Sequence, residues 1–399
     1  MADRYVFNRM ELAGSFGDLG TILPLAIGMI MVNGLSPHGL FLSVGLFYVF
    51  SGVYYGVTVP VQPMKVIGAY AVATSLTPSQ IGASGLLIGL ILLVLGTTGA
   101  MGVLGRYIPK SVIRGVQMAT GTLLVAQGVR FMTGTSKYQI VQGLAEPHMT
   151  LQAIGGMPVG WIIGIIGAVI TLFLLDNRRF PAGIVVVIYG FVLGLIWGTY
   201  DGLNLFTPGL FMPELLPFGF PTGADFSFVL IALVLPQLPM TVGNAVVANA
   251  DLSQEYFGPD SKRVTYKALC ITMGLANLVS FMLGGMPLCH GAGGLAAHYR
   301  FGARTAGSNL MIGLIFLVLA VFLGPRILEM VNLIPFSVLG VLLIFAGCQL
   351  GLTILDMKDR KDMFVILIML GITLASNLAV GFLVGIVLSY ALKSDRLAV

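Results

Sequence analysis

The sequence predicts an all-α polytopic membrane protein with about 14 transmembrane spans, arranged as a seven-plus-seven inverted repeat. Of its 399 residues, 57% are hydrophobic and 9% are charged, and the mean hydropathy is +0.97. This composition excludes an ordinary soluble domain of this length. Apolar runs of spanning length recur along nearly the whole chain, and short motifs recur in its two halves.

The spans form two sets that are joined by an external linker at 200–225. The first repeat, 1–199, is predicted to span at 12–33, 38–57, 63–77, 83–104, 111–129, 157–175 and 181–199. The second repeat, 226–399, is predicted to span at 226–249, 264–284, 290–303, 306–324, 331–351, 362–376 and 378–393. The polar stretch 130–156 is expected to be a second external loop.

Spans three and ten are too short to cross a membrane as complete helices. Extended leads at 58–62 and 285–289 would supply the missing length, so each span is expected to be a short β-strand followed by a half-helix. A helix that starts inside apolar sequence presents unpaired N–H groups and a positive dipole end, which suit an anion. Two such starts are typical of a transporter with its substrate site at the midplane.

Sequence matches relate the two halves. The segment 108–112 (IPKSV) matches 334–338 (IPFSV) at an offset of 226, and Gly17-Asp18 matches Gly243-Asn244 at the same offset. Pro60 matches Pro287 at an offset of 227. Since seven spans are an odd number, the second copy must be inverted in the membrane.

The basic residues predict the orientation. With the N-terminus in the cytoplasm, Arg130, Lys137 and Arg326 fall outside and Lys65 lies within the membrane, which leaves 17 of the 21 basic residues on the cytoplasmic side. Both termini are therefore expected in the cytoplasm, and the protein in the cell inner (plasma) membrane. The N-terminus has no signal-peptide cleavage pattern, so the first span is expected to be retained.

The sequence argues against several classes of function. Its three cysteines form no CxxC pair, and its histidines and acids show no metal-ligand spacing, so no metal and no cofactor are expected. No nucleophile–base arrangement indicates an enzyme, and no catalytic residue is assigned. The net charge of +5 is explained by membrane topology, so nucleic acid is not an expected partner. The glycine runs lack a P-loop Lys-Ser pair, which favours coupling to an ion gradient over ATP hydrolysis.

The start of span three carries Gln62, Met64 and Lys65. A lysine within apolar sequence is costly unless it is paired or hydrated, so Lys65 is a candidate for substrate binding. The alternatives are that it snorkels to the interface or pairs with Asp18. Gln62 can donate to an anion without a fixed charge, and the backbone N–H groups of 63–65 are expected to point at the substrate.

Spans one and eight bring polar groups toward the same place. In span one, Ser15 is a candidate substrate contact, and Asp18 could bind a coupling H⁺ or Na⁺ or serve as an N-cap or ion-pair partner. In span eight, Gln237, Thr241 and Asn244 are spaced i, i+4, i+7 and share one helix face. That face could bind substrate or the coupling ion, or make interhelical hydrogen bonds. Pro236 and Pro239 are expected to kink this helix and to free carbonyl groups.

Small residues follow His290 at the start of span ten. His290 could donate to an oxyanion, titrate during transport or serve as a structural donor, and Gly291, Ala292 and Gly293 leave their backbone N–H groups accessible. Two helix N-termini supply about half a positive charge each. Together with Lys65 they favour a dianion such as a tetrahedral oxyanion, although an ionised, unpaired Asp18 would weaken this attraction.

At these motifs the chain resembles the molybdate transporter family, which is related to sulfate permeases and nucleobase transporters. The matching segments are Gly17–Thr21, Pro60–Lys65, Gln237–Thr241, Gly285–Leu295 and Tyr299–Arg304. The resemblance covers essentially the whole chain and implies a core domain from spans 1–4 and 8–11 and a gate domain from spans 5–7 and 12–14. Relatives of this fold often dimerise, which makes a homodimer an expectation.

The resemblance implies a secondary active transporter that imports molybdate by alternating access, with tungstate or sulfate as competing substrates. A sulfate, tungstate or nucleobase carrier of the same fold and an anion channel are the alternatives. The chain is expected to lack the STAS domain that is usual in sulfate permeases. It also lacks an acid within span eight, where nucleobase transporters place a glutamate. Both departures favour molybdate.

Overall fold

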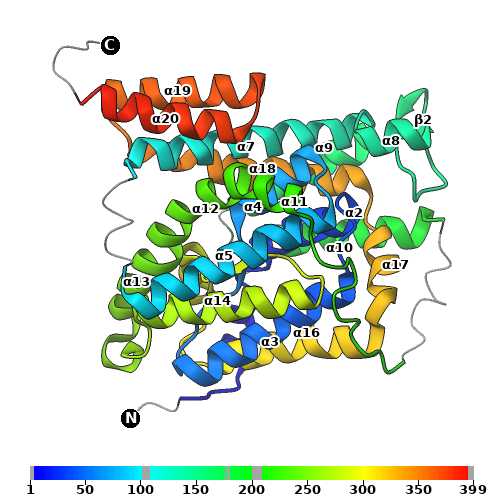
Figure 1. Ribbon diagram of the computed structural model, residues 1–399. Helices are drawn as coiled ribbons and strands as arrows, with labels where there is room; N and C mark the ends of the chain where they lie inside the picture. Colours follow the sequence, from blue (N-terminus) through cyan, green and yellow to red (C-terminus); the bar gives the residue numbers. More distant parts are fainter. Residues whose placement is uncertain (1–3, 101–107, 176, 178–179, 200–208, 394–399) are drawn as a thin grey trace.

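The computed structural model (Figure 1) describes residues 4–100, 108–175, 177, 180–199 and 209–393. The end of the predicted span 83–104, the part of the linker at 200–208 and four predicted cytoplasmic cations (Arg106, Arg178, Arg179 and Arg396) lie outside the described residues.

The described residues of the first half are mostly helical, with three very short strands. Its elements are α1 (Arg9–Ser15), α2 (Leu19–Met31), α3 (Pro37–Tyr55), β1 (Gln62–Pro63), α4 (Lys65–Thr74), α5 (Pro78–Thr98), α7 (Lys110–Thr133), α8 (Lys137–Gln142), β2 (Ala153–Ile154), β3 (Met157–Pro158), α9 (Val159–Leu174) and α10 (Ala182–Trp197). Local signals set several boundaries. For example, Thr77 and Gln80 form a capping box at the start of α5, and Gly99 ends it at a positive φ of 72°.

The second half repeats this character with one strand. Its elements are α11 (Gly223–Val229), a π-helical segment (Leu230–Val234), α12 (Leu235–Met240), a second π-helical segment (Thr241–Ala248), α13 (Asn249–Phe257), a 3-10 turn (Gly258–Ser261), α14 (Tyr266–Met282), β4 (Leu288–Cys289), α15 (Ala292–Phe301), α16 (Gly307–Leu323), a 3-10 turn (Gly324–Arg326), α17 (Ile327–Asn332), α18 (Phe336–Gly351), a 3-10 turn (Leu352–Asp356), α19 (Arg360–Ala375) and α20 (Leu378–Ala391).

The helices have the apolar character of a membrane protein. Among the described residues, five helical stretches are long and apolar enough to cross a membrane, and a sixth is gained if the bent pair α1–α2 counts as one span. Several other apolar helices are 10–17 residues long, including α4, α9, α10, α14 and α20. The count of fourteen spans therefore stays a prediction.

Two predicted segments differ in the structure. The span expected at 12–33 is two helices, α1 and α2, bent by 43° at Phe16–Asp18. The expected loop at 130–156 contains the end of α7, the helix α8 and part of a β-hairpin. Span eight is helical over Gly223–Ser261, and π-helical segments stand on both sides of α12, which contains Pro236 and Pro239.

The most extensive helix–helix contacts each join one helix of the first half to one helix of the second half. Helix α3 packs on α16, α5 packs on α14, and α7 packs on α18. Each pair crosses at glycines: a Cβ added to Gly121 of α7 would lie 2.6 Å from the carbonyl oxygen of Gly347 in α18, and one added to Gly347 would lie 2.5 Å from that of Gly121. Gly89 of α5 and Gly274 of α14 show the same reciprocal approach, at 3.1 and 3.0 Å. Only glycine permits backbones to pack this closely.

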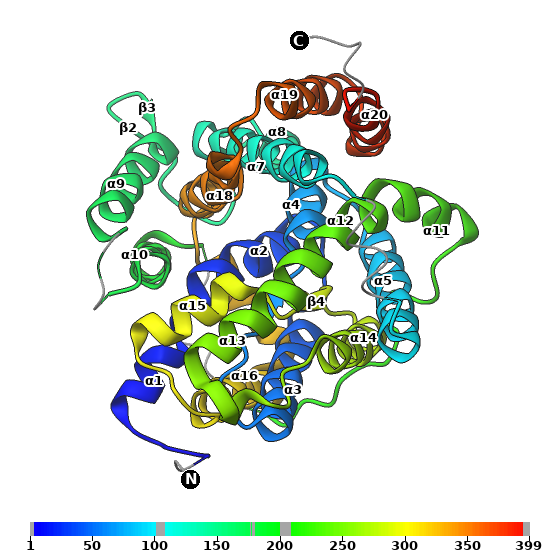
Figure 2. The same ribbon diagram turned by 90° about the vertical axis from the view of Figure 1, so that its left-hand side faces the viewer.

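The helices form two groups that meet along α4 and α12. Figures 1 and 2 show α7, α18, α19 and α20 together on one side, and α3, α5, α14 and α16 on the other. Helix α7 contacts α4 and α12, while α18 contacts α2. The candidate site lies where these two groups meet.

Candidate functional site

The predicted pair of extended leads forms a two-stranded sheet inside the protein. Strand β1 pairs antiparallel with β4, with Gln62 opposite Cys289, and the N–H of Met64 donates to the carbonyl of Pro287 over 2.9 Å. All four strand residues are buried. Each strand is followed almost at once by a ten-residue helix, α4 or α15, so two helix N-termini meet beside the sheet.

The N-terminus of α4 is capped by span eight. The side-chain oxygen of Gln237 accepts from the N–H groups of Val66 at 2.9 Å and Ile67 at 3.3 Å, and its amide donates to the hydroxyl of Thr241 at 2.9 Å. Gln237 and Thr241, both predicted substrate contacts, are therefore engaged with the protein. Since Pro63 has no N–H and that of Met64 lies in the sheet, the expected N–H donors of 63–65 reduce to Lys65.

The N-terminus of α15 is open. Its N-cap, Gly291, provides no side-chain hydrogen bond, and the helix begins with Ala292 and Gly293. A Cβ added to Gly293 would meet the Lys65 ammonium nitrogen at 3.8 Å and nothing else within 4 Å. The charged end of Lys65 and the first turn of α15 thus converge on one open space.

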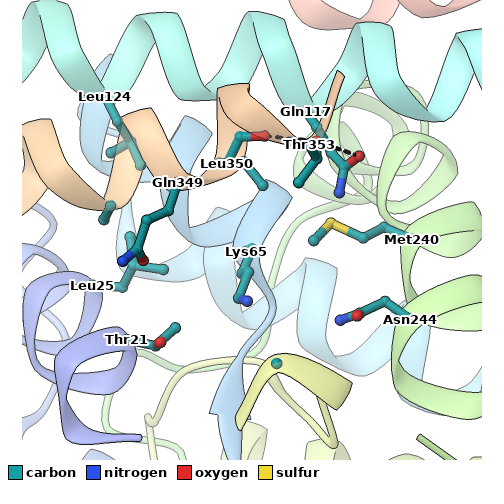
Figure 3. Close-up of a pocket in the computed structure, with 12 residues that line it drawn as sticks. Thr21, Leu25, Lys65, Gln117, Leu124, Met240, Asn244, Gln349, Leu350 and Thr353 are labelled. Carbon is teal, nitrogen blue, oxygen red and sulfur yellow. Dashed lines mark hydrogen bonds between the residues drawn. The ribbon is translucent and has the colours of Figure 1, made fainter. Parts of the chain in front are cut away.

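That space is a cavity of about 210 Å³ between the two groups of helices (Figure 3). Its lining comes from α2, α4, α7, α12, α15 and α18, from the π-helical segment after α12 and from the 3-10 turn after α18. It consists of Thr21, Leu25, Lys65, Gln117, Leu124, Met240, Asn244, Gly293, Ala346, Gln349, Leu350 and Thr353. In Figure 3 the ammonium group of Lys65 points into the middle of the cavity, with Thr21, Gln349 and Asn244 around it. Lys65 is the charged side chain of this lining.

No ion pair joins Lys65 to Asp18 within the part of the chain that the structure describes, so the pairing alternative is wrong for this conformation. Asp18 instead accepts from the side-chain amide of Gln62 at 2.5 Å. Both side chains are buried, at 1% exposure each. Asp18 precedes α2 as its N-cap residue, but its side chain makes no capping hydrogen bond.

The Asp18–Gln62 pair leaves two acceptors unused. The second carboxylate oxygen of Asp18 and the side-chain oxygen of Gln62 are buried and have no hydrogen-bond partner among the described residues. They lie against α15, because a Cβ on Gly294 would be 2.5 Å from the Asp18 oxygen and one on Gly291 would meet the Gln62 oxygen. Two unpaired buried acceptors are costly unless a proton or a cation satisfies them.

Ser15 and His290 lie away from the cavity lining. Ser15 donates to the carbonyl of Leu12 at 2.8 Å. The ring of His290 is buried, with Nδ1 2.7 Å from the carbonyl oxygen of Pro60 and Nε2 3.2 Å from the hydroxyl of Thr272. In this geometry His290 bonds within the protein, as expected if it serves as a structural donor.

Of the predicted site residues, the cavity brings together Lys65, Gly293 and Asn244. The residues that sequence reasoning missed are Gln117, Gln349 and Thr353, which come from the other group of helices. Gln117 and Thr353 are hydrogen-bonded to each other at 3.0 Å. The sequence feature that could have identified two of them is a side-chain amide inside an apolar span, as at Gln117 and Gln349.

Solved structures with a similar fold are transport proteins. The chain superposes with a TM-score of 0.64 on the transmembrane domain of the cyanobacterial bicarbonate transporter BicA, at 18% identity, over 96% of this chain and 98% of that one. It superposes on SLC26A9 with a TM-score of 0.67 at 13% identity, over 96% of this chain, and spans 65% of the SLC26A9 chain. These likenesses concern the fold.

Sequence comparison is more specific. The chain is 30% identical over 412 aligned positions to molybdate transporter 2 of Arabidopsis thaliana, covering 96% of this chain and 87% of the relative. The profile of the family described as "Molybdate transporter of MFS superfamily" matches residues 10–124 and 229–350. These matches include the strands β1 and β4 and the starts of α4 and α15. The chain therefore belongs to the molybdate transporter family, and it is an integral membrane protein.

Proposed function

We propose that the protein is a secondary active transporter that imports molybdate by alternating access, and that the anion binds between the Lys65 ammonium group and the first turn of α15. One observation carries the proposal: in the wall of the cavity, an unpaired cation faces an uncapped helix N-terminus. An ammonium group and a helix N-terminus both favour an anion. The curated relative named a molybdate transporter supports molybdate as that anion.

The polar lining suits an oxyanion. Thr21, Asn244 and Gln349 place hydroxyl and amide donors around Lys65, and the lining contains no carboxylate. The Asp18 carboxylate lies outside this lining and accepts a hydrogen bond from the side-chain amide of Gln62. The two helix starts contribute unequally to anion binding, because the side-chain oxygen of Gln237 already accepts from two N–H groups of α4.

Alternating access fits the position of the cavity between two groups of helices. We assign α1–α5 and α11–α16 to the core domain, and α7, α9, α10 and α18–α20 to the gate domain. Each domain thus draws helices from both proposed repeats, 1–199 and 226–399, which the linker 200–225 joins. The reciprocal glycine contacts between the halves support a seven-plus-seven repeat. Rocking of the gate helices α7 and α18 against α4 and α2 would open the cavity to each side in turn.

We assign coupling to Asp18, with Asn244 as a second candidate. The free oxygen of Asp18 could take up H⁺, or could bind Na⁺ together with the free oxygen of Gln62. Either ion would satisfy acceptors beside α15. Ion uptake would thus stabilise the same helix start that holds the substrate.

Molybdate binding and transport test the proposal. Removing the Lys65 charge should remove a charge-assisted contact of about 1.5–3 kcal/mol, so Lys65→Ala should weaken molybdate binding roughly 10- to 100-fold. Lys267→Ala, a lysine in α14 outside the cavity lining, is the matched control. Unchanged affinity in Lys65→Ala would contradict the assigned site.

Reconstituted vesicles distinguish the alternatives. A carrier should show saturable molybdate counterflow, whereas an anion channel should carry current without exchange. Competition by tungstate, sulfate and uracil ranks the substrates. A carrier that prefers sulfate or uracil to molybdate would refute the substrate assignment while leaving the site intact. An H⁺ or Na⁺ gradient that drives wild-type uptake should fail to drive Asp18→Asn.

A further inference from the structure

A second cavity lies further along the same helices. It measures about 430 Å³ and is lined by the ends of α4, α7 and α19 and by the start of α8, through Tyr70, Ala73, Thr74, Ser75, Leu123, Gln127, Arg130, Thr135, Lys137, Thr373, Leu374 and Ser376. Most of these side chains are polar, two are cationic and none is acidic. No ion pair involves Arg130 or Lys137 in the part of the chain that the structure describes.

The two cavities share the helices α4 and α7 and follow one another along them. On α4, Lys65 lines the first cavity and Tyr70 begins the second, a separation of about 7.5 Å along the helix axis. On α7, Gln117 and Leu124 line the first cavity, while Gln127 and Arg130 line the second. Helices α4 and α7 contact each other, and two of the lining side chains are buried: Leu124 of the first cavity at 1% exposure and Tyr70 of the second at 6%.

The charge pattern assigns the second cavity to the outer side. Arg130 and Lys137 are two of the three basic residues that the orientation leaves outside, so they are exceptions to the bias toward cytoplasmic cations. At this end of α7 both side chains are exposed, and they rim a polar cavity. A concave site lined by charge of one sign raises the local concentration of the opposite ion.

We propose that this second cavity is an outer vestibule that captures the tetrahedral oxyanion before it reaches Lys65. The inference rests on the proposed function, because it takes the first cavity to be the transport site. The contact between α4 and α7 would then be the outer gate, closed in this structure. Its opening would join two cavities that are little more than one helical turn apart.

Uptake kinetics from each face provide the main test. In vesicles of neutral phosphatidylcholine, the double variant Arg130→Gln/Lys137→Gln should raise the KM for molybdate from the outer face about tenfold at low ionic strength. The increase should shrink to about twofold or less in high potassium gluconate, because salt screens exposed charges. Uptake from the inner face and equilibrium affinity in detergent should be unchanged. Arg326→Gln removes a predicted outer charge away from the cavity and is the matched control.

Other results would overturn the inference. One is an unchanged KM for molybdate in the double variant, and another is an equal increase in KM from both faces of the vesicle. The others are an equal increase in KM in Arg326→Gln, or an increase confined to vesicles that contain anionic lipid. The last result would assign the cavity to a lipid headgroup. In each case wild-type molybdate transport would still support the proposed function.

A labelling experiment is independent of the transported substrate. In a Cys348→Ser background, a cysteine introduced by Thr135→Cys should react several-fold faster with an anionic sulfonate-bearing thiosulfonate than with an uncharged one, after correction for their intrinsic rates. The Arg130→Gln/Lys137→Gln changes should abolish that preference. A preference that persists would show that these cations do not create the local potential, even if the protein failed to carry molybdate.

Discussion

Adding one methyl group to Gly293 should separate substrate binding from folding. Gly293 is the second residue of α15, and an added Cβ would have only the Lys65 ammonium nitrogen within 4 Å, at 3.8 Å. Gly293→Ala therefore needs no rearrangement of the protein. Because alanine favours a helix over glycine by about 0.5–1 kcal/mol, stability without substrate should stay the same or rise.

The same methyl group should obstruct the anion. It would occupy the space between Lys65 and the first N–H groups of α15, where a charge-assisted hydrogen bond contributes about 1.5–3 kcal/mol. Losing one such bond corresponds to roughly 10- to 100-fold weaker molybdate binding. The assay is titration calorimetry of the detergent-solubilised protein, with thermal unfolding measured in the absence of molybdate.

The control is Gly243→Ala. Gly243 lies in the π-helical segment next to Asn244, is exposed, and has no atom within 4 Å of an added Cβ. Its affinity should match the wild type. Wild-type affinity in Gly293→Ala would refute the placement of the anion at α15, whereas weaker binding in both variants would indicate a general effect of substitution.

Three further substitutions test the surroundings. Gln237→Ala should lower the unfolding temperature, because two buried N–H groups at the start of α4 lose their acceptor at about 1–3 kcal/mol; an unchanged temperature would contradict the capping role. Gly294→Ala should destabilise the protein, unlike Gly293→Ala, since its Cβ would lie 2.5 Å from a carboxylate oxygen of Asp18; thermal unfolding compares the two. Glu146 lies between α8 and β2 and accepts from two N–H groups of α18, and burial raises its pKa from 4.5 to about 7. Because the folded protein favours the protonated Glu146 carboxyl, this carboxyl contributes up to ~3 kcal/mol to the free energy of unfolding below pH 4.5, and the contribution is lost as pH rises through about 7. Glu146→Gln should therefore flatten the fall in stability over this pH range.

The amino-acid sequence determined the class of protein and the positions of its two broken spans. Composition identified a membrane protein, and the short apolar runs after Pro60 and Pro287 located the strands and half-helices that the structure shows. These features are local, because the chain's own hydropathy and prolines impose them. The bend between α1 and α2 was missed, since that run is apolar on both sides of Asp18.

Only the tertiary structure decided which polar groups face the cavity. Gln62, Lys65 and Gln237 are all candidates in sequence, but packing directs Gln62 to Asp18 and Gln237 to α4, and leaves Lys65 in the cavity. A buried polar group takes whichever partner the neighbouring helices bring to it, and those partners lie 44 and 171 residues away along the chain. The opposite wall of the cavity, with Gln349 and Thr353, is formed by helices that the local motifs do not reach.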